Sequence, residues 1–194
     1  MTKTLILLAA GLSRRFGPEN KLLSPVAGRP LYRHTLDKLE RLQAPDTRLL
    51  VMTNTPEIQA WCQSRKIPWG ESPEAALGIS HTIRAALALA GEIEAYVFFV
   101  ADQPKLEETT IKRLLSSCEA KNALLGCLVC GERRGNPVWF SALLRPELEA
   151  LTGDTGGRAV LKNHWAQAVK VEADRSELED VDLPSCLSGK ITVK

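Results

Sequence analysis

Three continuous apolar runs, each followed by a helical pattern, constrain the fold more than any other feature of the sequence. The runs cover residues 4–8, 49–53 and 96–100, and none of them alternates apolar with polar residues. Such runs are typical of strands that are buried on both faces, as in a parallel sheet covered by helices. We therefore predict an α/β fold with a doubly wound, mostly parallel, Rossmann-like sheet.

The residues around and between these runs repeat at helical spacing. The positions in each stripe lie mostly three or four residues apart, which places them on one face of a helix. Each such face would pack on the sheet within a right-handed crossover. The stripes are Leu31, Thr35, Leu39 and Leu42; Ile58, Trp61 and Cys62; Ile79, Ile83, Ala86, Leu87 and Ala90; and Ile111, Leu114, Leu115 and Cys118.

The second half of the chain is less regular and predicts a hairpin or a mixed, antiparallel addition to the sheet. No repeat, low-complexity tract or linker-like segment divides the chain, so we expect one domain over residues 1–194. The expected elements are strands at 123–130, 138–140 and 168–172, a basic turn at 133–137, a short helix ending at 148–151, and another from 156 to about 164.

Composition limits both the partners and the compartment. Lys and Arg number 25 against 23 Asp and Glu, and a net charge of +2 gives no long-range attraction to nucleic acid or an anionic membrane. The apolar run at 5–10 is shorter than an export-signal core, and no run approaches the roughly 20 residues of a membrane-spanning helix. Five Cys at irregular spacing form no disulfide pattern. We expect a cytoplasmic protein with reduced thiols.

The segment directly after the first predicted strand has the composition of a phosphate-binding turn. The small residues Ala-Ala-Gly at 9–11 allow backbone N–H groups to approach a ligand, while Ser13, Arg15 and Lys21 add donors and positive charge. The segment lacks the end of a Walker loop and the three glycines of a dinucleotide fingerprint. A turn whose basic side chains are merely solvated is the alternative.

Asp102 immediately follows the most apolar predicted strand. Its carboxylate is therefore expected at the same edge of the sheet as the turn at 9–11, where open α/β sheets bind ligands. A carboxylate is a hard oxygen ligand that suits Mg²⁺. A polar turn at the end of a strand would explain Asp102 alone, but an anion-binding turn and a metal carboxylate at one edge favour a Mg-nucleotide site.

Four segments resemble the motifs of a known family. Leu-Ala-Ala-Gly-x-Ser-x-Arg-Phe-Gly at 8–17, with Lys21, resembles the signature of nucleotidyltransferases that activate a phosphate-bearing acceptor with a nucleoside triphosphate. The segments 102–104, 134–137 and 153–158 resemble later motifs of one branch, the molybdenum cofactor nucleotidyltransferases. The resemblance covers most of the chain, and it implies the sheet described above and an enzyme that needs Mg²⁺.

The resemblance also implies a pair of substrates. Ala-Ala-Gly at 9–11 is the form seen in the cytidylyltransferases of this branch, whereas the guanylyltransferases usually carry Gly-Gly, so CTP is favoured over GTP. The implied acceptor is the molybdopterin form of the cofactor, whose phosphate would attack the α-phosphorus in line and release pyrophosphate. A molybdoenzyme apoprotein would be the partner that receives the product.

The roles that the family implies fall on matching positions of this chain. Arg15 and Lys21 would face the phosphates, and Asp102 would hold Mg²⁺, so positioning and charge neutralisation would supply the catalysis. The expected catalytic residues are Arg15, Lys21 and Asp102; the expected nucleotide-binding residues are Ala9, Ala10, Gly11, Leu12, Ser13, Arg15, Lys21 and Thr82; and the expected metal ligands are Asp102 and Asp154.

Thr82 lies where the family places a hydroxyl against the base. His81-Thr82 replaces the usual Ser-Ser, which weakens this assignment, although Thr keeps the hydroxyl group. A helix N-cap at Ser80 or Thr82 is the structural alternative. Of the three histidines, which form no ligand pattern, only His81 is placed to touch a substrate.

Asp154 and the basic segment near Asn136 also have two interpretations. Asp154 or Thr155 could cap the helix expected from 156, or Asp154 could contact a second metal or the acceptor, beside an anion site that includes Arg158. A hairpin turn explains 133–137, whereas its two arginines could also meet the acceptor.

Cys127 and Cys130 invite a metal or redox interpretation. Residues three apart in a strand point to opposite faces, however, so a shared metal is disfavoured.

Three functions remain open at this stage. The first is a Mg-dependent cytidylyltransferase acting on molybdopterin. The second is a guanylyltransferase, or a transferase for another phosphorylated acceptor, which would use the same charged residues. The third is a non-catalytic protein that binds the cofactor and inserts it into an apoenzyme.

Overall fold

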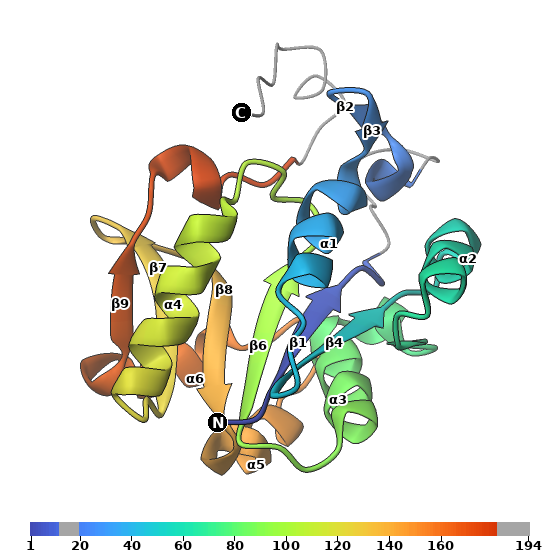
Figure 1. The fold of residues 1–194 in the computed structure, drawn as a ribbon. Coiled ribbons are helices and arrows are strands. Elements are labelled where there is room, and N and C mark those ends of the chain that lie inside the picture. The colour runs from blue at the N-terminus through green and yellow to red at the C-terminus, as the bar shows by residue number, and fades with distance from the viewer. Residues whose placement is uncertain (12–19, 182–194) are drawn as a thin grey trace.

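The computed structural model describes residues 1–11 and 20–181, which form a seven-stranded sheet between two layers of helices (Figure 1). The strand order is β5-β4-β1-β6-β8-β7-β9. β1 (Lys3–Leu8) pairs in parallel with β4 (Thr47–Met52) on one side and with β6 (Ala95–Val100) on the other, and β5 (Trp69–Gly70) extends this half beyond β4. The predicted doubly wound, mostly parallel sheet is confirmed.

The second half of the chain adds the predicted mixed portion of the sheet. β8 (Arg133–Ser141) runs antiparallel to both β6 and β7 (Leu125–Cys130), while β9 (Val169–Glu172) pairs in parallel with β7. The basic turn expected at 133–137 is wrong, because these residues begin β8. The pairing register shifts between Cys127 and Leu128, so the ladder passes over Asn136 and Pro137. A proline fits such a bulge because it has no N–H to donate to the ladder.

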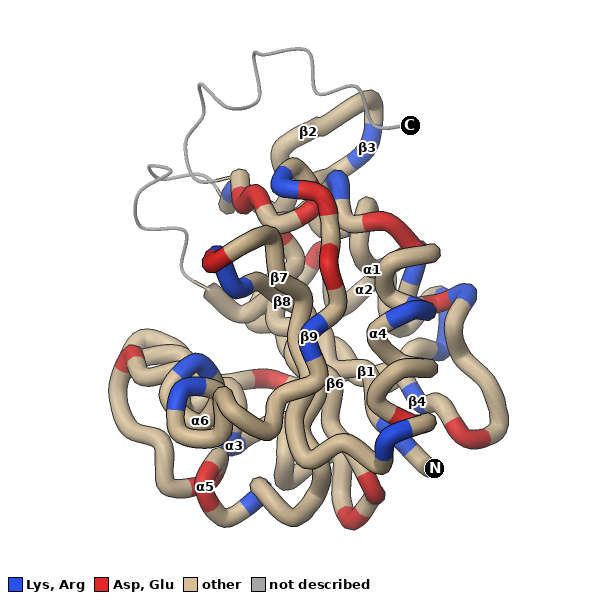
Figure 2. The backbone as a smooth tube through the Cα atoms, turned by 90° about the vertical axis from the view of Figure 1, so that its left-hand side faces the viewer, with Lys and Arg blue, Asp and Glu red and all other residues tan. Residues whose placement is uncertain are grey.

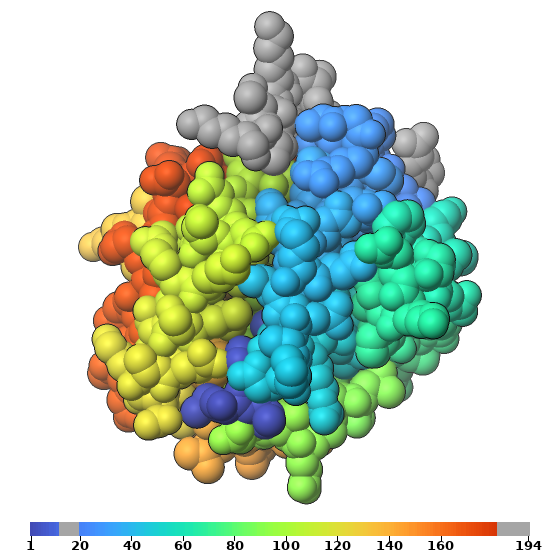
Figure 3. Space-filling model, in the orientation of Figure 1, coloured from blue at the N-terminus to red at the C-terminus, as the bar shows by residue number. Residues whose placement is uncertain are grey.

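The helices cover both faces of the sheet, as doubly wound folds require. In Figure 3, α1 and α4 lie over one face, and α2 lies beside α1. On that face are α1 (Leu31–Arg41), α2 (Pro56–Arg65) and α4 (Glu108–Ala120); on the other are α3 (Ile79–Ala90), α5 (Arg145–Glu149) and α6 (Arg158–Asn163).

Alternate residues of β1 belong to different hydrophobic cores. Leu5 and Leu7 pack under α1, α2 and α4, whereas Ile6 packs under α3, and all three side chains are fully buried. Burying such a side chain contributes about 1.5–3 kcal/mol. The two-sided burial explains why the strand reads as an unbroken apolar run, since neither face of it meets water.

Several short elements had no signal in the sequence. A two-residue strand or a single turn is too short to show a hydrophobic period. The short elements are the hairpin of β2 (Pro25–Val26) and β3 (Arg29–Pro30), the strand β5, and the 3₁₀ turns Lys21–Leu23, Ala75–Leu77, Ala142–Leu144, Trp165–Gln167 and Arg175–Leu178.

No helix in the described ranges is long and apolar enough to cross a membrane.

The start of α3 differs from the expected capping. Gly78 is the N-cap residue, and Ser80 and Thr82 lie inside the first turn, so the prediction that either one caps the helix is wrong. Gly78 has a φ of +123°, and a Cβ there would lie 2.2 Å from the carbonyl oxygen of Gly153. Glycine is needed at this position because it permits both the backbone conformation and the close approach of the two loops.

The start of α6 corrects a second capping expectation. Gly157 is the N-cap residue, and no side chain accepts a hydrogen bond from the first turn, so neither Asp154 nor Thr155 caps this helix. The ring of Phe140 lies where a side chain at Gly157 would extend, at 2.8 Å from the position of a Cβ. The N-cap position of α6 packs so closely on Phe140 of β8 that a glycine is needed there.

Buried His34 makes the stability of the fold depend on pH. Its Nε2 lies 2.8 Å from the carbonyl oxygen of Val26 and donates to it, and its Nδ1 is buried with no hydrogen-bond partner in the described part of the chain. Burial lowers the pKa of His34 because it disfavours the charged ring. The unfolded chain therefore takes up this proton more readily, and stability falls as pH drops through the ordinary His pKa of about 6.5 and below.

We expect His34→Gln to reduce this pH dependence. Glutamine retains an N–H donor for the carbonyl of Val26 but does not titrate, so the variant should lose less stability than wild type between about pH 7.5 and about pH 5.5. Urea unfolding midpoints of both proteins at both pH values measure the difference. Equal losses in the two proteins would contradict the assigned role of His34.

Candidate active site

One edge of the sheet gathers the segments that the sequence singled out. β1 and β6 both end at the upper edge in Figure 1, and β8 begins there because it runs in the opposite direction. The turn after β1, the loop after β6 and the first residues of β8 therefore share this edge. In open α/β sheets, the carboxyl ends of the strands are where ligands bind.

Lys21 and Asp102 form an ion pair at this edge. The Nζ of Lys21 lies 2.6 Å from Oδ2 of Asp102, and the two side chains are 16% and 18% exposed. Asp102 is positioned by the end of β6. Lys21 is positioned by its neighbours: the Asn20 side chain accepts from the Leu22 N–H and donates to the Thr55 hydroxyl at 2.7 Å. The structure thus brings together two of the three expected catalytic residues.

The second carboxylate oxygen of Asp102 has no hydrogen-bond partner among the described residues. Oδ1 is buried and accepts no hydrogen bond from any residue in the described ranges, which is costly for a carboxylate oxygen. Such an oxygen fits the donor chemistry that Mg²⁺ prefers. Within those same ranges, no group of three or more Asp, Glu, His or Cys side chains is placed to hold a metal. A metal at Asp102 would therefore take further ligands from substrate phosphates and water, as Mg²⁺ commonly does.

The segment 174–181, which follows β9, contacts both members of this ion pair through the backbone of Val181. The Val181 N–H donates to the carbonyl oxygen of Asp102 at 3.0 Å, and the Val181 carbonyl accepts from Nζ of Lys21 at 3.1 Å. Beside it, the Gln103 amide donates to Oδ1 of Asp180 at 2.8 Å. One residue therefore contacts both members of the pair, which ties the position of the C-terminal segment to the geometry of the site.

A buried carboxylate holds this C-terminal segment in place. Glu177 is 5% exposed and accepts hydrogen bonds from the Glu107 N–H, the Thr110 hydroxyl and the Asp174 N–H. A carboxylate with several donors is well satisfied in the interior. Glu177 could not be predicted from the sequence, because an isolated glutamate has no pattern that distinguishes it from a surface residue.

Lys38, on α1, also supports the loop after Asp102. Its ammonium donates to the carbonyls of Pro104 and Leu106 at 3.1 and 2.5 Å, and the Thr35 hydroxyl donates to the carbonyl of Gln103 at 3.3 Å. Burial lowers the pKa of Lys38 to about 8 because it disfavours the charged amine. Lys38 was also missed, since it occupies a polar position on an amphipathic helix.

The turn after β1 is partly described. Ala9 and Ala10 are buried, whereas Gly11 is exposed and has open space where a side chain would project. The Ala9 N–H donates to the carbonyl of Met52 at 2.8 Å, so this amide is used within the sheet. The other expected members of the turn, Leu12, Ser13 and Arg15, lie outside the described residues.

Thr82 is buried next to Ser72, which is in turn held by Asn54. Its hydroxyl lies 3.0 Å from the Ser72 hydroxyl, and the Ser72 backbone is held by both ends of the Asn54 side-chain amide, at 2.7 and 2.8 Å. This network fixes the loop before α3 against the end of β4. A base that contacts Thr82 would therefore have to share or replace the bond to Ser72, a residue with no motif in the sequence.

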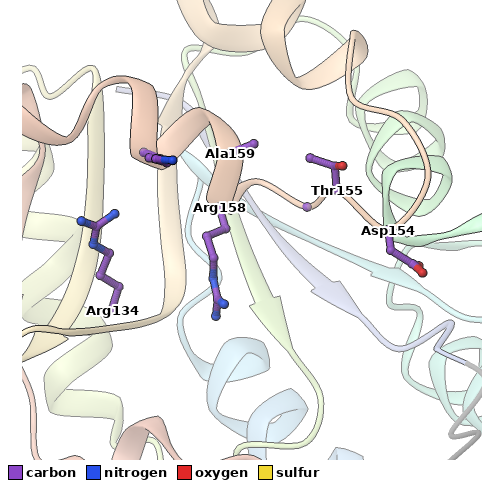
Figure 4. Close-up of a pocket in the computed structure, with 7 residues that line it drawn as sticks. Arg134, Asp154, Thr155, Arg158 and Ala159 are labelled. Carbon is purple, nitrogen blue, oxygen red and sulfur yellow. The ribbon is translucent and has the colours of Figure 1, made fainter.

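Asp154 lies on the loop that packs against the start of α3. The Ser80 N–H donates to the carbonyl of Gly153 at 3.2 Å, which joins this loop to the helix. Asp154 is exposed and, among the described residues, makes no hydrogen bond or ion pair. Figure 4 shows its carboxylate pointing away from Arg134 and Arg158.

The remaining candidates have structural partners. His81 Nδ1 lies 2.7 Å from the Glu74 carboxylate, and Arg133 donates to the carbonyl of Leu178 at 2.7 Å. Cys127 and Cys130 pack into the hydrophobic cores on opposite faces of the sheet, as the strand geometry predicts. Burial raises the pKa of the Cys127 thiol to about 11.

Curated relatives include the bifunctional protein GlmU of Acinetobacter baylyi. It is 30% identical to this chain over 146 residues, which are 75% of this chain and 31% of GlmU. The chain therefore spans about a third of the length of that relative. The similarity concerns only this part of the larger protein.

Solved structures share the fold over nearly the whole chain. Rv0371c of Mycobacterium tuberculosis H37Rv superimposes with a TM-score of 0.76 at 23% identity over 94% of each chain. Its manganese complex gives 0.71 at 21% identity over 90% of this chain and 89% of that one. A CMP:2-keto-3-deoxy-manno-octonic acid synthetase complexed with CTP gives 0.71 at 14% identity over 96% and 95%.

The family assignment rests on the sequence itself. Residues 5–169, which run from β1 to the start of β9 and include Lys21, Asp102 and the loop before α6, match the family described as the MobA-like NTP transferase domain. That match covers most of the chain. The protein therefore belongs to the MobA-like NTP transferase family.

Proposed function

We propose that this nucleotidyltransferase is a Mg-dependent cytidylyltransferase that transfers CMP from CTP to the phosphate of a molybdopterin-type acceptor and releases pyrophosphate. The nucleotide choice is supported by Ala-Ala-Gly at 9–11 and the acceptor by the segments 102–104, 134–137 and 153–158, through the family resemblance of these motifs. The proposed site residues are those expected from the sequence. Asp154 is the proposed second metal ligand.

The observation that carries the proposal is the state of Asp102. One of its carboxylate oxygens is paired with Lys21 at 2.6 Å, and the other is buried, without a hydrogen-bond partner among the described residues, at the edge where the strands end. A half-paired, mostly buried carboxylate of this kind suits a hard divalent cation carried by a nucleotide. The manganese complex of Rv0371c, a protein with the same fold, supports a divalent metal as well.

The residues of the chain act by position and charge. Lys21 and Arg15 bind the phosphates of the nucleotide, and the small residues at 9–11 let the backbone approach them. The acceptor phosphate attacks the α-phosphorus in line, and pyrophosphate leaves from the opposite side, without a covalent enzyme intermediate. Mg²⁺, when bound, would neutralise charge on the phosphates. Lys21 contributes through a preorganised positive charge beside the reacting group.

A transferase for another phosphorylated acceptor is the second candidate. The curated relative described above is a GlmU protein rather than a molybdenum cofactor enzyme, and this favours keeping the acceptor open. Both candidates share the same nucleotide chemistry at Lys21 and Asp102. They differ in the acceptor and in the nucleotide preferred.

Thermal stabilisation by CTP, GTP, ATP and UTP, each with and without Mg²⁺, tests the proposed nucleotide. A ligand at about 100 times its Kd stabilises the native state by roughly 2.7 kcal/mol, which raises the Tm of a domain of this size by several degrees. We expect the largest shift with CTP and Mg²⁺ together. A GTP preference would favour the guanylyltransferase, and no shift with any nucleotide would favour a non-catalytic carrier.

Asp102→Asn should abolish the Mg-dependent part of that shift and the release of pyrophosphate. The amide keeps the size of the side chain but removes the charge that would bind the cation. Asp46→Asn is the control, since Asp46 is 52% exposed and precedes β4 at the opposite edge of the sheet. Turnover of Asp102→Asn at the wild-type rate would overturn the metal assignment.

Lys21→Met should slow pyrophosphate release by about 10²–10³-fold, the usual cost of losing one preorganised charge-stabilising donor. Methionine retains much of the apolar stem but none of the positive charge. Lys112→Met, on the exposed side of α4, is the matched control. Rates of Lys21→Met within about twofold of wild type would show that Lys21 does not face the phosphates.

A further inference from the structure

Asp102 lies beyond the last paired residue of β6, so a loop rather than the sheet sets its position. The parallel pairing of β6 with β1 ends at Val100, and its antiparallel pairing with β8 extends only as far as Phe98. Residues 103–107 then lead to α4, and most of them are buried. Buried main-chain polar groups need hydrogen-bond partners, and those partners fix the course of the loop.

Two charged side chains from distant parts of the chain hold this loop by its backbone. The ammonium of Lys38 donates to the carbonyls of Pro104 and Leu106, at 3.1 and 2.5 Å. The carboxylate of Glu177 accepts from the N–H of Glu107 at 2.9 Å. Hydrogen bonds in which one partner is ionised are roughly twice as strong as neutral ones. The course of the loop therefore depends on the charges of Lys38 and Glu177.

Charges of both signs act on Lys38. Arg29 on β3 and Arg41 on α1 disfavour its charged form. The carboxylates of Glu107, before α4, and Glu177 favour it. Figure 2 shows Lys and Arg positions interspersed with Asp and Glu positions around α1 and α4. Burial has the largest effect and lowers the pKa of Lys38 to about 8, so this side chain changes its charge at a mildly alkaline pH.

We propose that Lys38 is a positioning residue for Asp102: its ammonium, supported by the buried carboxylate of Glu177, fixes the loop 103–107 and with it the carboxylate at the edge of the sheet. The consequence for metal binding rests on the proposed function, whereas the fixing of the loop does not. Loss of the Lys38 proton leaves a neutral amine, which forms weaker bonds to the same carbonyls. The loop and the affinity for a Mg-nucleotide should therefore weaken together as the pH rises through about 8.

This effect has the opposite sign to a loss of stability caused by the same group. The pKa of Lys38 is lower in the folded chain than its ordinary value of about 10.4, so the unfolded chain binds the proton more tightly. Between about pH 8 and about pH 10.4, Lys38 therefore makes the folded state more stable as the pH rises. A weakening of the site over that range is not a consequence of Lys38 destabilising the fold.

Two backbone amides report the position of the loop in the free protein, without metal or nucleotide. The Glu107 N–H donates to the carboxylate of Glu177. The Val181 N–H donates to the carbonyl oxygen of Asp102 at 3.0 Å. In ¹H–¹⁵N spectra recorded from pH 7 to pH 9.5, both signals should shift together with a midpoint near pH 8. The indole signal of buried Trp139 should not shift over this range.

Variants assign this titration to Lys38. Lys38→Met retains the apolar stem and should abolish the shifts of both amides. Glu177→Gln removes a charge that favours the ammonium, so it should lower the midpoint. Lys112→Met, on the exposed side of α4, is the matched control and should titrate like wild type. Shifts that are absent in wild type, or that persist unchanged in Lys38→Met, would overturn the proposal. The wild-type titration decides this even where a variant does not fold.

The Mg²⁺ concentration that half-saturates CTP binding, measured by calorimetry, tests the link to Asp102. In wild type it should rise about three- to tenfold between pH 7.5 and pH 9, the range expected when a charge-assisted hydrogen bond is weakened. In Lys38→Arg, which keeps its charge over this range, it should change less than twofold. Excess Mg²⁺ should restore full binding in wild type at pH 9, because a misplaced ligand lowers affinity, whereas unfolding would lower the number of sites.

The two measurements separate failure of the proposal from failure of the proposed function. A wild-type Mg²⁺ requirement that stays constant while the loop titrates would overturn the role of Lys38 in positioning Asp102. Absence of CTP binding at every pH would contradict the proposed function, and the amide titration would then support or overturn the fixing of the loop by itself.

Discussion

The ion pair between Lys21 and Asp102 is the interaction on which the edge of this sheet is organised. Taking two charges largely out of water is costly, and within the described part of the chain a single short contact leaves one buried oxygen of Asp102 unsatisfied. Hydrophobic packing does not require such a pair at the end of β6. The arrangement is understandable as half of a larger charged assembly, which the phosphates and the metal of a nucleotide would complete.

Segments distant in the sequence converge on this pair. Val181 bonds to both residues through its backbone, and buried Glu177 fixes the segment that carries it. Lys38, on α1, holds the carbonyls of the loop after Asp102. Each of these groups satisfies its own polar atoms while it restricts the site. Stability and positioning therefore depend on the same hydrogen bonds, as preorganised electrostatic catalysis requires.

The sequence was most informative where hydrophobic burial alone decides the structure. Strands buried on both faces, such as β1, could be predicted because their residues serve two cores, and Asp102 could be placed because it ends such a strand. Capping was misjudged at Gly78 and Gly157, where close packing between loops outweighed the capping tendency of nearby polar side chains. Ser72 and Glu177 were not predicted because only long-range contacts, absent from any local pattern, give them a role.

The central claim is that Asp102 binds the metal of a nucleotide at the carboxyl edge of the sheet. Crystals of the protein grown with CTP and Mn²⁺ test it most directly, since Mn²⁺ favours the same oxygen ligands as Mg²⁺ and has an anomalous signal. The account predicts an anomalous peak in coordinating contact with Oδ1 of Asp102 and with phosphate oxygens of CTP. A well-ordered CTP complex whose Mn²⁺ lies elsewhere, with Asp102 still paired only to Lys21, would contradict it.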